Sequence, residues 1–351
     1  KIIGLIAGVL AITGAGPRWL QAENVLPFLF NVLVVKVGLI VPVGAIFLAF
    51  LVNYGLMEFI GVLMQPIMRP LFKTPGRSAI DALASFVGSY SLGLLITDRV
   101  YREGRYTGKE ACIIATGFST VSATFMVIVA ERLSLMYRWN TYFWTTLFIT
   151  FVVTAVVLRI PPLSRKGDSL FSKLQSSPEE DGGLSLPRKA YHRALARAAA
   201  APPIVSCVKS SLLDAFKMVT VILPTILSIG LFGLLLANYT PLFDLLGGLF
   251  YPLCWLLGIP EAWLAAKACA VEVSEMFLPA LLVVEAPLMT RYVVAVVSVS
   301  AILFFSASIP CILATRIPIG LGELILIWFE RTLLSICLAV PAYWLFMAGP
   351  S

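Results

Sequence analysis

The feature that most constrains the fold of this chain is a series of apolar runs separated by short polar loops. Hydrophobic residues make up 59% of the 351 residues and charged residues only 13%, whereas a soluble domain usually carries about a quarter charged residues. A chain of this composition has more apolar surface than its own core can bury, so the remainder must face lipid. We therefore predict an all-α polytopic membrane protein, with the lipid bilayer as its surroundings.

The residues that carry metal, redox or nucleophile chemistry are few and scattered. The six cysteines stand singly in or beside apolar runs, without a CxxC pair, and the one histidine, His192, lies in a basic polar linker. No GxGxxG or P-loop sequence is present. The sequence therefore indicates no metal site, no cofactor and no enzyme. The net charge of +7 collects in loops between the apolar runs, which is typical of membrane orientation rather than of nucleic-acid binding.

Several apolar segments are interrupted in the middle by small and polar residues. A ten-residue helix covers only about 15 Å, half the hydrocarbon thickness, so segments 77–97 and 261–284 are predicted to be re-entrant hairpins. The segments 111–133 and 292–314 are predicted to cross as interrupted helices, because unwound backbone is tolerated at depth where protein or a cavity surrounds it. Unbroken crossings are predicted at 2–15, 37–52, 142–158, 217–237 and 321–346, interfacial helices at 54–72 and 242–257, and a short basic helix at 187–201.

The order of these elements repeats along the chain. Lys36–Pro42 parallels Lys217–Pro224, and Phe118–Thr120 parallels Phe305–Ala307, so the offset stays between 181 and 187 residues. Such self-similarity indicates two structural repeats. We divide the chain into an N-terminal transmembrane helix (1–20), which we expect to be trimmed before Lys1, a first repeat (25–162), a linker (163–205) and a second repeat (206–346).

The positive charges predict how the repeats are oriented. Basic residues gather between Arg69 and Lys109 and again between Arg159 and Lys217, whereas 238–290 holds only Lys267. The basic regions, including the linker, should be cytoplasmic. The two repeats then have opposite orientations, and one hairpin enters from each side. Inverted repeats with broken helices that meet near the midplane are the architecture of secondary transporters.

Four longer motifs carry a family resemblance. The runs Pro75–Gly88, Ala115–Phe125, Arg159–Ser164 and Glu275–Leu281 resemble the YjiH family of bacterial membrane proteins with nucleoside-recognition, or Gate, domains. The resemblance extends over nearly the whole chain. It implies two Gate repeats, similar to those of ferrous-iron transporters and distantly to those of concentrative nucleoside transporters, and it implies the bacterial inner membrane.

Charged residues or clusters of polar residues inside a membrane suggest a function, because their desolvation costs at least a few kcal/mol. Under the predicted topology, four such clusters converge at the middle of the membrane. The candidate solute-binding residues are Ser85, Ser89, Tyr90 and Ser91 on the first hairpin, Ser119, Thr120, Ser122 and Thr124 in the first interrupted helix, Glu272, Ser274 and Glu275 on the second hairpin, and Ser306 and Ser308 in the second interrupted helix. Glu272 and Glu275 share a helix face and are the candidate ion-coupling groups, because a coupled carrier needs acids that can be alternately exposed and neutralised.

Each cluster also has a purely structural interpretation. The small residues of the first hairpin would permit close helix packing, and the serines and threonines of the interrupted helix would bond back to their own backbone. Lys267 would pair with Glu272 on the second hairpin. On the last span, a buried ion pair among Glu323, Glu330 and Arg331 is a further interpretation whose role stays open, and we expect Asp98 to pair with a nearby arginine.

Taken together, the pattern predicts a secondary transporter of a small polar organic solute, either a nucleoside, an amino acid or a small peptide. Alternating access would move the solute, with coupling to protons or sodium as an option. The alternative is a non-transporting membrane receptor or scaffold that acts through a partner protein docked on the basic segment Arg188–Arg197. The sequence leaves open whether the chain forms a homo-oligomer.

Overall fold

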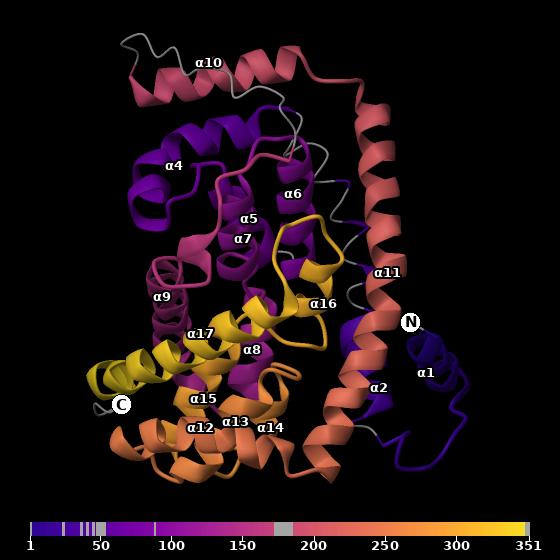
Figure 1. Cartoon of the computed structure of the whole chain (residues 1–351), viewed down its shortest axis with the longest axis vertical. Coiled ribbons are helices and arrows are strands. Elements are labelled where there is room, and N and C mark those ends of the chain that lie inside the picture. The colour runs from indigo at the N-terminus through magenta and orange to yellow at the C-terminus, as the bar shows by residue number, and fades with distance from the viewer. Residues whose placement is uncertain are drawn as a thin grey trace.

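A computed structural model describes most of the chain as a bundle of helices (Figure 1). Within the described part, the only β-structure is an isolated bridge between Thr107 and Leu170. The all-α prediction is therefore confirmed for these residues. The predicted crossing at 37–52 lies largely outside them. The structure describes residues 2–22, 25–35, 38–39, 42–43, 46, 54–87, 89–171 and 185–347.

The first half of the chain contains the predicted hairpin and the predicted helix interruption. The hairpin arms are α5 and α6, and the interrupted crossing consists of α7 and α8, with non-helical backbone between them. Helix α4 contains Pro66 and Pro70 near its end and corresponds to the predicted interfacial helix. The helices are α1 (Ile2–Thr13), α2 (Leu26–Phe28), α4 (Leu56–Phe72), α5 (Ser78–Val87), α6 (Tyr90–Arg102), α7 (Gly108–Gly117), α8 (Ala123–Arg132) and α9 (Trp139–Val157).

The second half repeats this order, with α12 as the interfacial helix, α13 and α14 as the hairpin, and α15 and α16 as the interrupted crossing. One predicted element is longer than expected. Helix α11 has 36 residues, or about 54 Å, because the helix continues through the polar residues that precede the apolar run at 217–237. The helices are α10 (Leu186–Ala199), α11 (Ile204–Tyr239), α12 (Leu242–Leu256), α13 (Ala262–Val271), α14 (Leu278–Leu282), α15 (Leu288–Ser300), α16 (Ser308–Leu313) and α17 (Leu321–Ala342).

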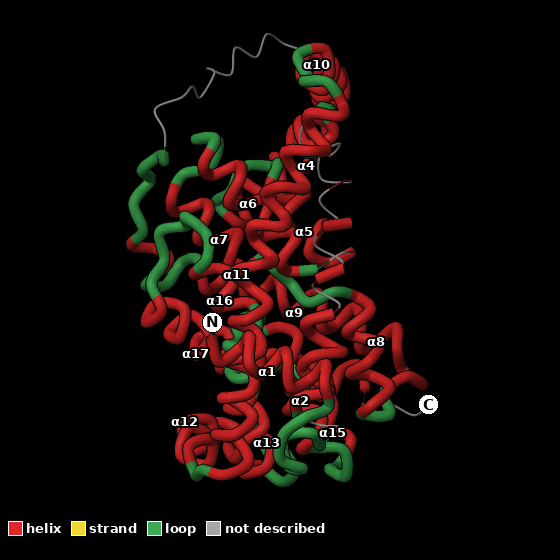
Figure 2. The backbone as a smooth tube through the Cα atoms, turned by 90° about the vertical axis from the view of Figure 1, so that its right-hand side faces the viewer, coloured by secondary structure: helices red, strands yellow, loops and turns green. Residues whose placement is uncertain are grey.

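The two repeats point in opposite directions along the long axis of the molecule. In Figure 1, α4 lies near the upper end and α12 at the lower end, and the hairpin that follows each of them extends toward the middle. The view turned by 90° gives the same arrangement, with α4, α5 and α6 above and α12 and α13 below (Figure 2). Helix α11 runs beside both repeats, and α10 lies across the upper end (Figure 1).

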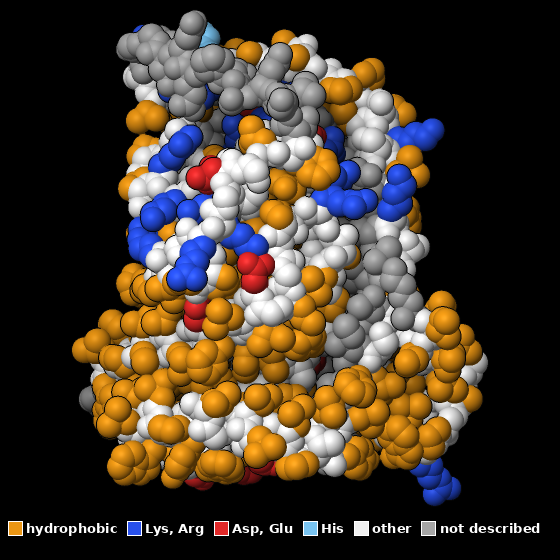
Figure 3. Space-filling view, in the orientation of Figure 1, with side chains coloured by type: hydrophobic (Ala, Val, Ile, Leu, Met, Phe, Trp, Pro, Cys, Tyr) orange, Lys and Arg blue, Asp and Glu red, His pale blue; other side chains and the backbone are white. Residues whose placement is uncertain are grey.

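The surface of the molecule is apolar over a broad region. In the view of Figure 3, hydrophobic side chains cover the lower half, while most basic side chains lie in the upper half. Large apolar residues project outward from several helices, among them Trp144 and Phe148 of α9, which are 64% and 70% exposed. Two helical stretches, Met136–Val157 and Leu321–Met347, are long and apolar enough to cross a bilayer. Exposed apolar area of this extent belongs in lipid, so the chain is a membrane protein.

Candidate functional site

The first hairpin keeps its small hydroxyl side chains within its own fold. Ser89 and Ser91 at the tip are buried, and their Oγ atoms are hydrogen-bonded to each other at 2.7 Å. Ser85 is fully buried, and its Oγ lacks a hydrogen-bond partner among the described residues. That oxygen lies against Gly93 on the opposite arm, where an added Cβ atom would come within 1.9 Å of it. The close approach of the arms therefore fits the packing interpretation of Ser85.

The interruption between α7 and α8 buries two of the predicted hydroxyl residues. Ser119 and Thr120 are only 2% and 3% exposed, and Ser119 Oγ has no hydrogen-bond partner in the described structure. Ser122 has a local role, because it is the N-cap of α8 and its hydroxyl accepts a hydrogen bond from the backbone N–H of Phe125 at 3.4 Å. The side chain of Thr124 lies outside the described part of the structure.

The second hairpin places two buried acids at its tip. Glu272 Oε2 accepts a hydrogen bond of 2.6 Å from the indole Nε1 of Trp328 on α17. Glu275 Oε2 accepts hydrogen bonds from the backbone N–H groups of Phe277 and Leu278, at 2.7 and 3.1 Å. Both carboxylates are at most 1% exposed. Each of them thus uses one oxygen for structure and keeps the other, Oε1, without a partner among the described residues.

The interruption between α15 and α16 is bonded directly to this hairpin tip. The backbone N–H groups of Phe305 and Ser306 donate to the carbonyl oxygens of Val273 and Ser274, at 2.6 and 2.8 Å. The Ser274 hydroxyl donates back to a carbonyl of its own helix end at 2.9 Å. Ser308 stabilises the interruption, because its Oγ accepts a hydrogen bond of 2.8 Å from the backbone N–H four residues earlier.

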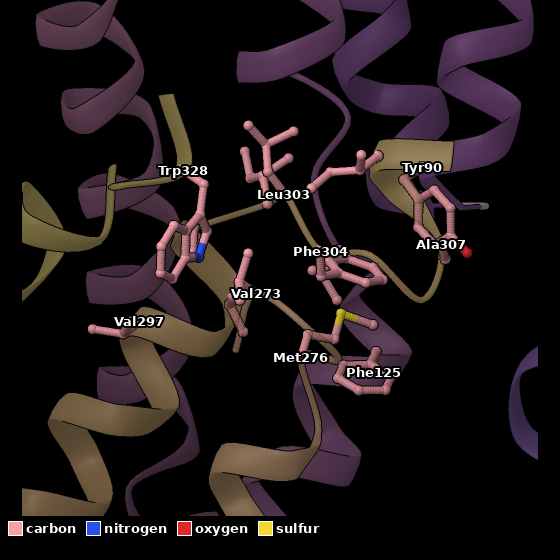
Figure 4. Packing of buried hydrophobic residues seen from close by; sticks show 14 of the residues in the cluster. Tyr90, Phe125, Val273, Met276, Val297, Leu303, Phe304, Ala307 and Trp328 are labelled. Atoms are coloured by element: carbon pink, nitrogen blue, oxygen red, sulfur yellow. The ribbon is translucent and has the colours of Figure 1, made fainter. Parts of the chain in front are cut away.

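Aromatic contacts bring segments of the two repeats together at the centre of the molecule. The ring of Tyr90 at the first hairpin tip lies 5.7 Å from that of Phe304 in the second interruption, with the rings edge to face. Phe125 of α8 makes a similar contact of 5.9 Å with Phe277 of the second hairpin. Figure 4 shows Phe304 between Tyr90 and Val273.

Several buried polar atoms of these segments lack a hydrogen-bond partner among the described residues. The two carboxylate oxygens accept hydrogen bonds or bind cations, and the hydroxyls can donate or accept. Among the described residues, no three His, Cys, Asp or Glu side chains are grouped as a metal site would require. The arrangement therefore suits a polar solute or a single cation. The unpartnered atoms of this central site are Tyr90 Oη, Ser119 Oγ, Glu272 Oε1, Glu275 Oε1 and Ser306 Oγ.

Two further residues support this site: the sequence interpretation did not name Trp328, and it named Arg331 only as a member of a possible ion pair. Trp328 fixes Glu272, and Arg331, one turn further along α17, is 1% exposed and donates hydrogen bonds to backbone carbonyls at the end of α15. A lone arginine in an apolar span is a signal that can be detected in a sequence. A tryptophan in such a span carries no comparable signal, because tryptophan is common in membrane helices.

Three expectations about charge pairs can now be compared with the structure. Asp98 pairs with Arg102 at 2.8 Å, as predicted. Lys267 does not pair with Glu272, because a spacing of five residues turns the two side chains about 140° apart around a helix. It pairs instead with Asp244 of α12 at 2.7 Å.

The expected ion pair on the last span is also absent from the described residues. Glu323 pairs instead with Lys166 at 2.7 Å. Glu330 has a buried Oε2 without a partner in the described structure. Arg331 faces backbone carbonyls. Each of the three side chains therefore has a different environment, and they do not form the expected ion pair.

Comparisons with known proteins give the family context. The model of the Gate family, described as nucleoside recognition, matches residues 34–136. An uncharacterised protein of Alkalihalophilus pseudofirmus, BpOF4_10220, is 36% identical over 307 residues, which are 86% of this chain and 65% of that protein. The chain thus spans less than two thirds of the length of this curated relative. The narrower YjiH assignment stays a prediction.

Solved structures with some likeness to the chain are those of CNTnw. A doubly substituted variant in an outward-facing state has 19% sequence identity and a TM-score of 0.44, and the match covers 99% of this chain and 85% of that one. CNTnw in an inward-facing, substrate-bound state has 16% identity and a TM-score of 0.44, with the same coverage. A likeness of this size establishes neither a shared mechanism nor a shared ligand. The family match is more specific: the chain carries a Gate domain, of the family described as nucleoside recognition, over residues 34–136.

Proposed function

We propose that this protein is a secondary transporter that binds a small polar organic solute at the central site and moves it by alternating access. The solute would be held between the tip of the second hairpin, the two helix interruptions and Tyr90. The protein would reside in the bacterial inner membrane, with the linker 163–205 on the cytoplasmic side, where the basic residues of the chain gather.

The observation that carries this proposal is the set of buried polar atoms at the central site that have no protein partner in the described structure. Buried polar groups in native proteins are nearly always hydrogen-bonded, and one left unpaired costs about 1–3 kcal/mol. Five such atoms belong to the first hairpin tip, the two interruptions and the second hairpin. The second interruption is in contact with both hairpin tips. A bound polar solute or cation would supply the partners that the protein does not.

The architecture supports movement around that site. A hairpin arm of ten residues, such as α5, covers about 15 Å, so each hairpin reaches only to the middle of a bilayer. Because the two hairpins come from opposite ends of the molecule, displacement of either one would open the centre toward one side only. This is the geometric requirement for alternating access.

The acids of the second hairpin favour a positively charged coupling ion or a solute with N–H donors. Glu272 and Glu275 have no ion-pair partner among the described residues. A charge at that depth is costly unless it is neutralised. Protons and sodium ions are both able to neutralise them, and an amine group of the solute would do the same.

The substrate class is best approached through the Gate domain. Its family is described as nucleoside recognition, so nucleosides are the first class to test. Their hydroxyl and amino groups would match the acceptor oxygens of Glu272 and Glu275 and the hydroxyls of Ser119 and Ser306. Amino acids and small peptides present similar donors and form the second group.

The experiment is solute uptake into proteoliposomes, with a panel of nucleosides, amino acids and small peptides, with and without a proton or sodium gradient. We expect one class to accumulate. Glu272→Gln and Glu275→Gln should each reduce its uptake at least tenfold, because each removes a carboxylate at the site; this corresponds to about 1.4 kcal/mol. Ser119→Ala combined with Ser306→Ala should reduce it as well.

Matched controls are available elsewhere in the second half of the chain. Glu323→Gln removes an acid that pairs with Lys166 away from the site, and Ser298→Ala removes a buried hydroxyl that bonds to its own helix at 2.9 Å. Both should transport like the wild type. Unchanged uptake in the Glu272→Gln and Glu275→Gln variants would contradict the site. If the solute binds but does not accumulate, and no ion gradient affects its binding, the result would instead favour a receptor or scaffold function.

A further inference from the structure

Arg331 of α17 is a fully buried cation that faces the end of another helix. Its Nε donates to the carbonyl oxygens of Ser300 and Ala301, both at 3.1 Å, and its Nη2 donates to Ser300 O at 2.7 Å. Ser300 is the last residue of α15, where the crossing is interrupted. The last carbonyls of a helix have no partner within the helix and form the negative end of its dipole. A planar guanidinium suits this position, because its donors form a rigid fork.

The backbone beyond this contact is strained. Ile302 has a φ of +67°, a conformation that a β-branched residue rarely adopts. Such a conformation costs about 1–3 kcal/mol and persists only when the surroundings fix it. The carbonyls of the two residues before Ile302 are bonded to Arg331. The guanidinium thus fixes the exit from α15 at the point where the chain leaves helical geometry.

The first repeat has a similar contact at its own interruption. Helix α7 ends at Gly117, whose carbonyl oxygen lies 3.1 Å from Thr154 Oγ1 of α9. An added Cβ atom on Gly117 would lie 2.4 Å from Thr154 Cγ2, so the glycine permits α9 to approach this closely. The Thr154 hydroxyl can donate its single hydrogen to that carbonyl or to Thr150 O at 2.8 Å.

One hydrogen bond connects the two contacts. Arg331 Nη1 donates to Thr154 Oγ1 at 3.0 Å. This bond occupies a lone pair of the threonine oxygen and leaves its hydrogen for a carbonyl. The last helices of the two repeats, α17 and α9, are thereby linked to each other and to the ends of α15 and α7.

A different role for Arg331 as a ligand-binding cation fits the structure less well. All three of its guanidinium nitrogens already donate to protein atoms, and it forms no ion pair with an acid among the described residues. Among the described residues no hydrogen bond or ion pair joins it to Glu272, whose Oε2 accepts a hydrogen bond from Trp328 instead. The contacts of Arg331 are those of a residue that positions backbone.

We propose that Arg331 is a positioning residue that joins the two helix interruptions through Thr154 and so keeps the two halves of the central site in register. The link between the helix ends can be tested without any solute. Its importance for transport rests on the proposed function.

The test is hydrogen exchange measured by mass spectrometry on the full-length protein in lipid nanodiscs. Thr154→Val preserves the shape of the side chain and removes the hydroxyl, and Thr150→Val, one turn away with a hydroxyl that bonds only within α9, is the control. Thr154→Val should speed exchange at least threefold in peptides covering 114–122 and 300–307, whereas Thr150→Val should leave both unchanged. Equal behaviour of the two variants would overturn the proposal.

Variants of Arg331 test whether its guanidinium acts on both helix interruptions. Arg331→Met should speed exchange in both segments, and Arg331→Lys, which keeps the charge but loses the fork, should do so to a smaller degree. In the Arg331→Met background, adding Thr154→Val should have no further effect on 300–307, because the link is already broken. An Arg331→Met effect confined to 300–307 would contradict the joining role. If Arg331→Met does not fold, Arg331→Lys and Thr154→Val still decide the question.

Uptake assays separate this proposal from the proposed function. If the protein transports a solute, Thr154→Val should lower the uptake rate at least threefold. Its thermal stability should equal that of the Thr150→Val control. Uptake equal to that of the control would show that the link does not position the site. Absence of uptake in the wild type would contradict only the proposed function, since the exchange measurements need no solute.

Discussion

The two hairpins both bury acidic side chains, but they use them differently. In the first hairpin, Asp81 is 1% exposed, and both of its oxygens accept hydrogen bonds of 2.7 Å, one from Thr97 Oγ1 and the other from Tyr106 Oη. In the second hairpin, Glu272 and Glu275 each keep one oxygen without a partner among the described residues. The same type of group thus has both oxygens bonded in the first hairpin and leaves acceptors without a described partner in the second hairpin.

This difference shows that burial of an acid is not by itself a sign of function. A buried carboxylate whose two oxygens are both bonded is a structural element, because it satisfies donors that would otherwise be unpaired. A buried carboxylate with one unbonded oxygen needs another partner.

Replacing Asp81, whose two carboxylate oxygens are both hydrogen-bonded, should lower the stability more than replacing Glu272, which has one unbonded oxygen. Asp81→Ala leaves the buried Tyr106 hydroxyl without its partner, and we expect a loss of roughly 1–3 kcal/mol from two hydrogen bonds at membrane depth. Glu272→Gln keeps an acceptor for Trp328 and removes a buried charge, so it should not destabilise. Thermal unfolding in detergent measures both. The comparison fails if Glu272→Gln destabilises the protein as much as Asp81→Ala.

The indole of Trp328 should matter for the orientation of Glu272. Trp328→Phe removes the Nε1 donor and keeps an aromatic ring, so solute affinity should fall by about three- to tenfold, as expected for one hydrogen bond. Trp144→Phe on the exposed face of α9 is the control and should bind like the wild type. A Trp328→Phe variant with unaltered affinity would mean that the carboxylate needs no orientation by α17.

The ion pair near the start of the second hairpin should contribute least. Lys267 and Asp244 meet at 2.7 Å, with their side chains 28% and 38% exposed. Such pairs are worth less than about 1 kcal/mol, so Lys267→Gln should shift the unfolding temperature only slightly and leave uptake unchanged. A strong loss of uptake in this variant would place functional charge at the base of the hairpin rather than at its tip.

Much of this architecture could be predicted from the sequence, because its signals are local. Polar residues that interrupt apolar runs predicted both hairpins and both broken crossings, since an apolar helix gains nothing from them. Serine at an N-cap is also a local signal, and Ser122 occupies that position.

The partners of the site residues could not be predicted in the same way. Trp328 meets Glu272 from 56 positions away, and Arg331 binds backbone carbonyls, which carry no sequence signature. Ser85 illustrates the same limit: the sequence makes it a candidate binding residue, and the approach of Gly93 to its Oγ is a contact that no local pattern encodes. Long-range pairing depends on how the two repeats dock, which a local pattern does not encode.

A polar solute or cation should bind between the second hairpin and the helix interruptions. A high-resolution density map of the protein in nanodiscs, prepared with the solute identified by uptake, would show whether it does. We expect non-protein density within hydrogen-bonding distance of Glu272 Oε1, Glu275 Oε1 and Ser306 Oγ. A map in which these atoms are bonded to protein side chains, with the solute bound elsewhere, would rule out the proposed binding site.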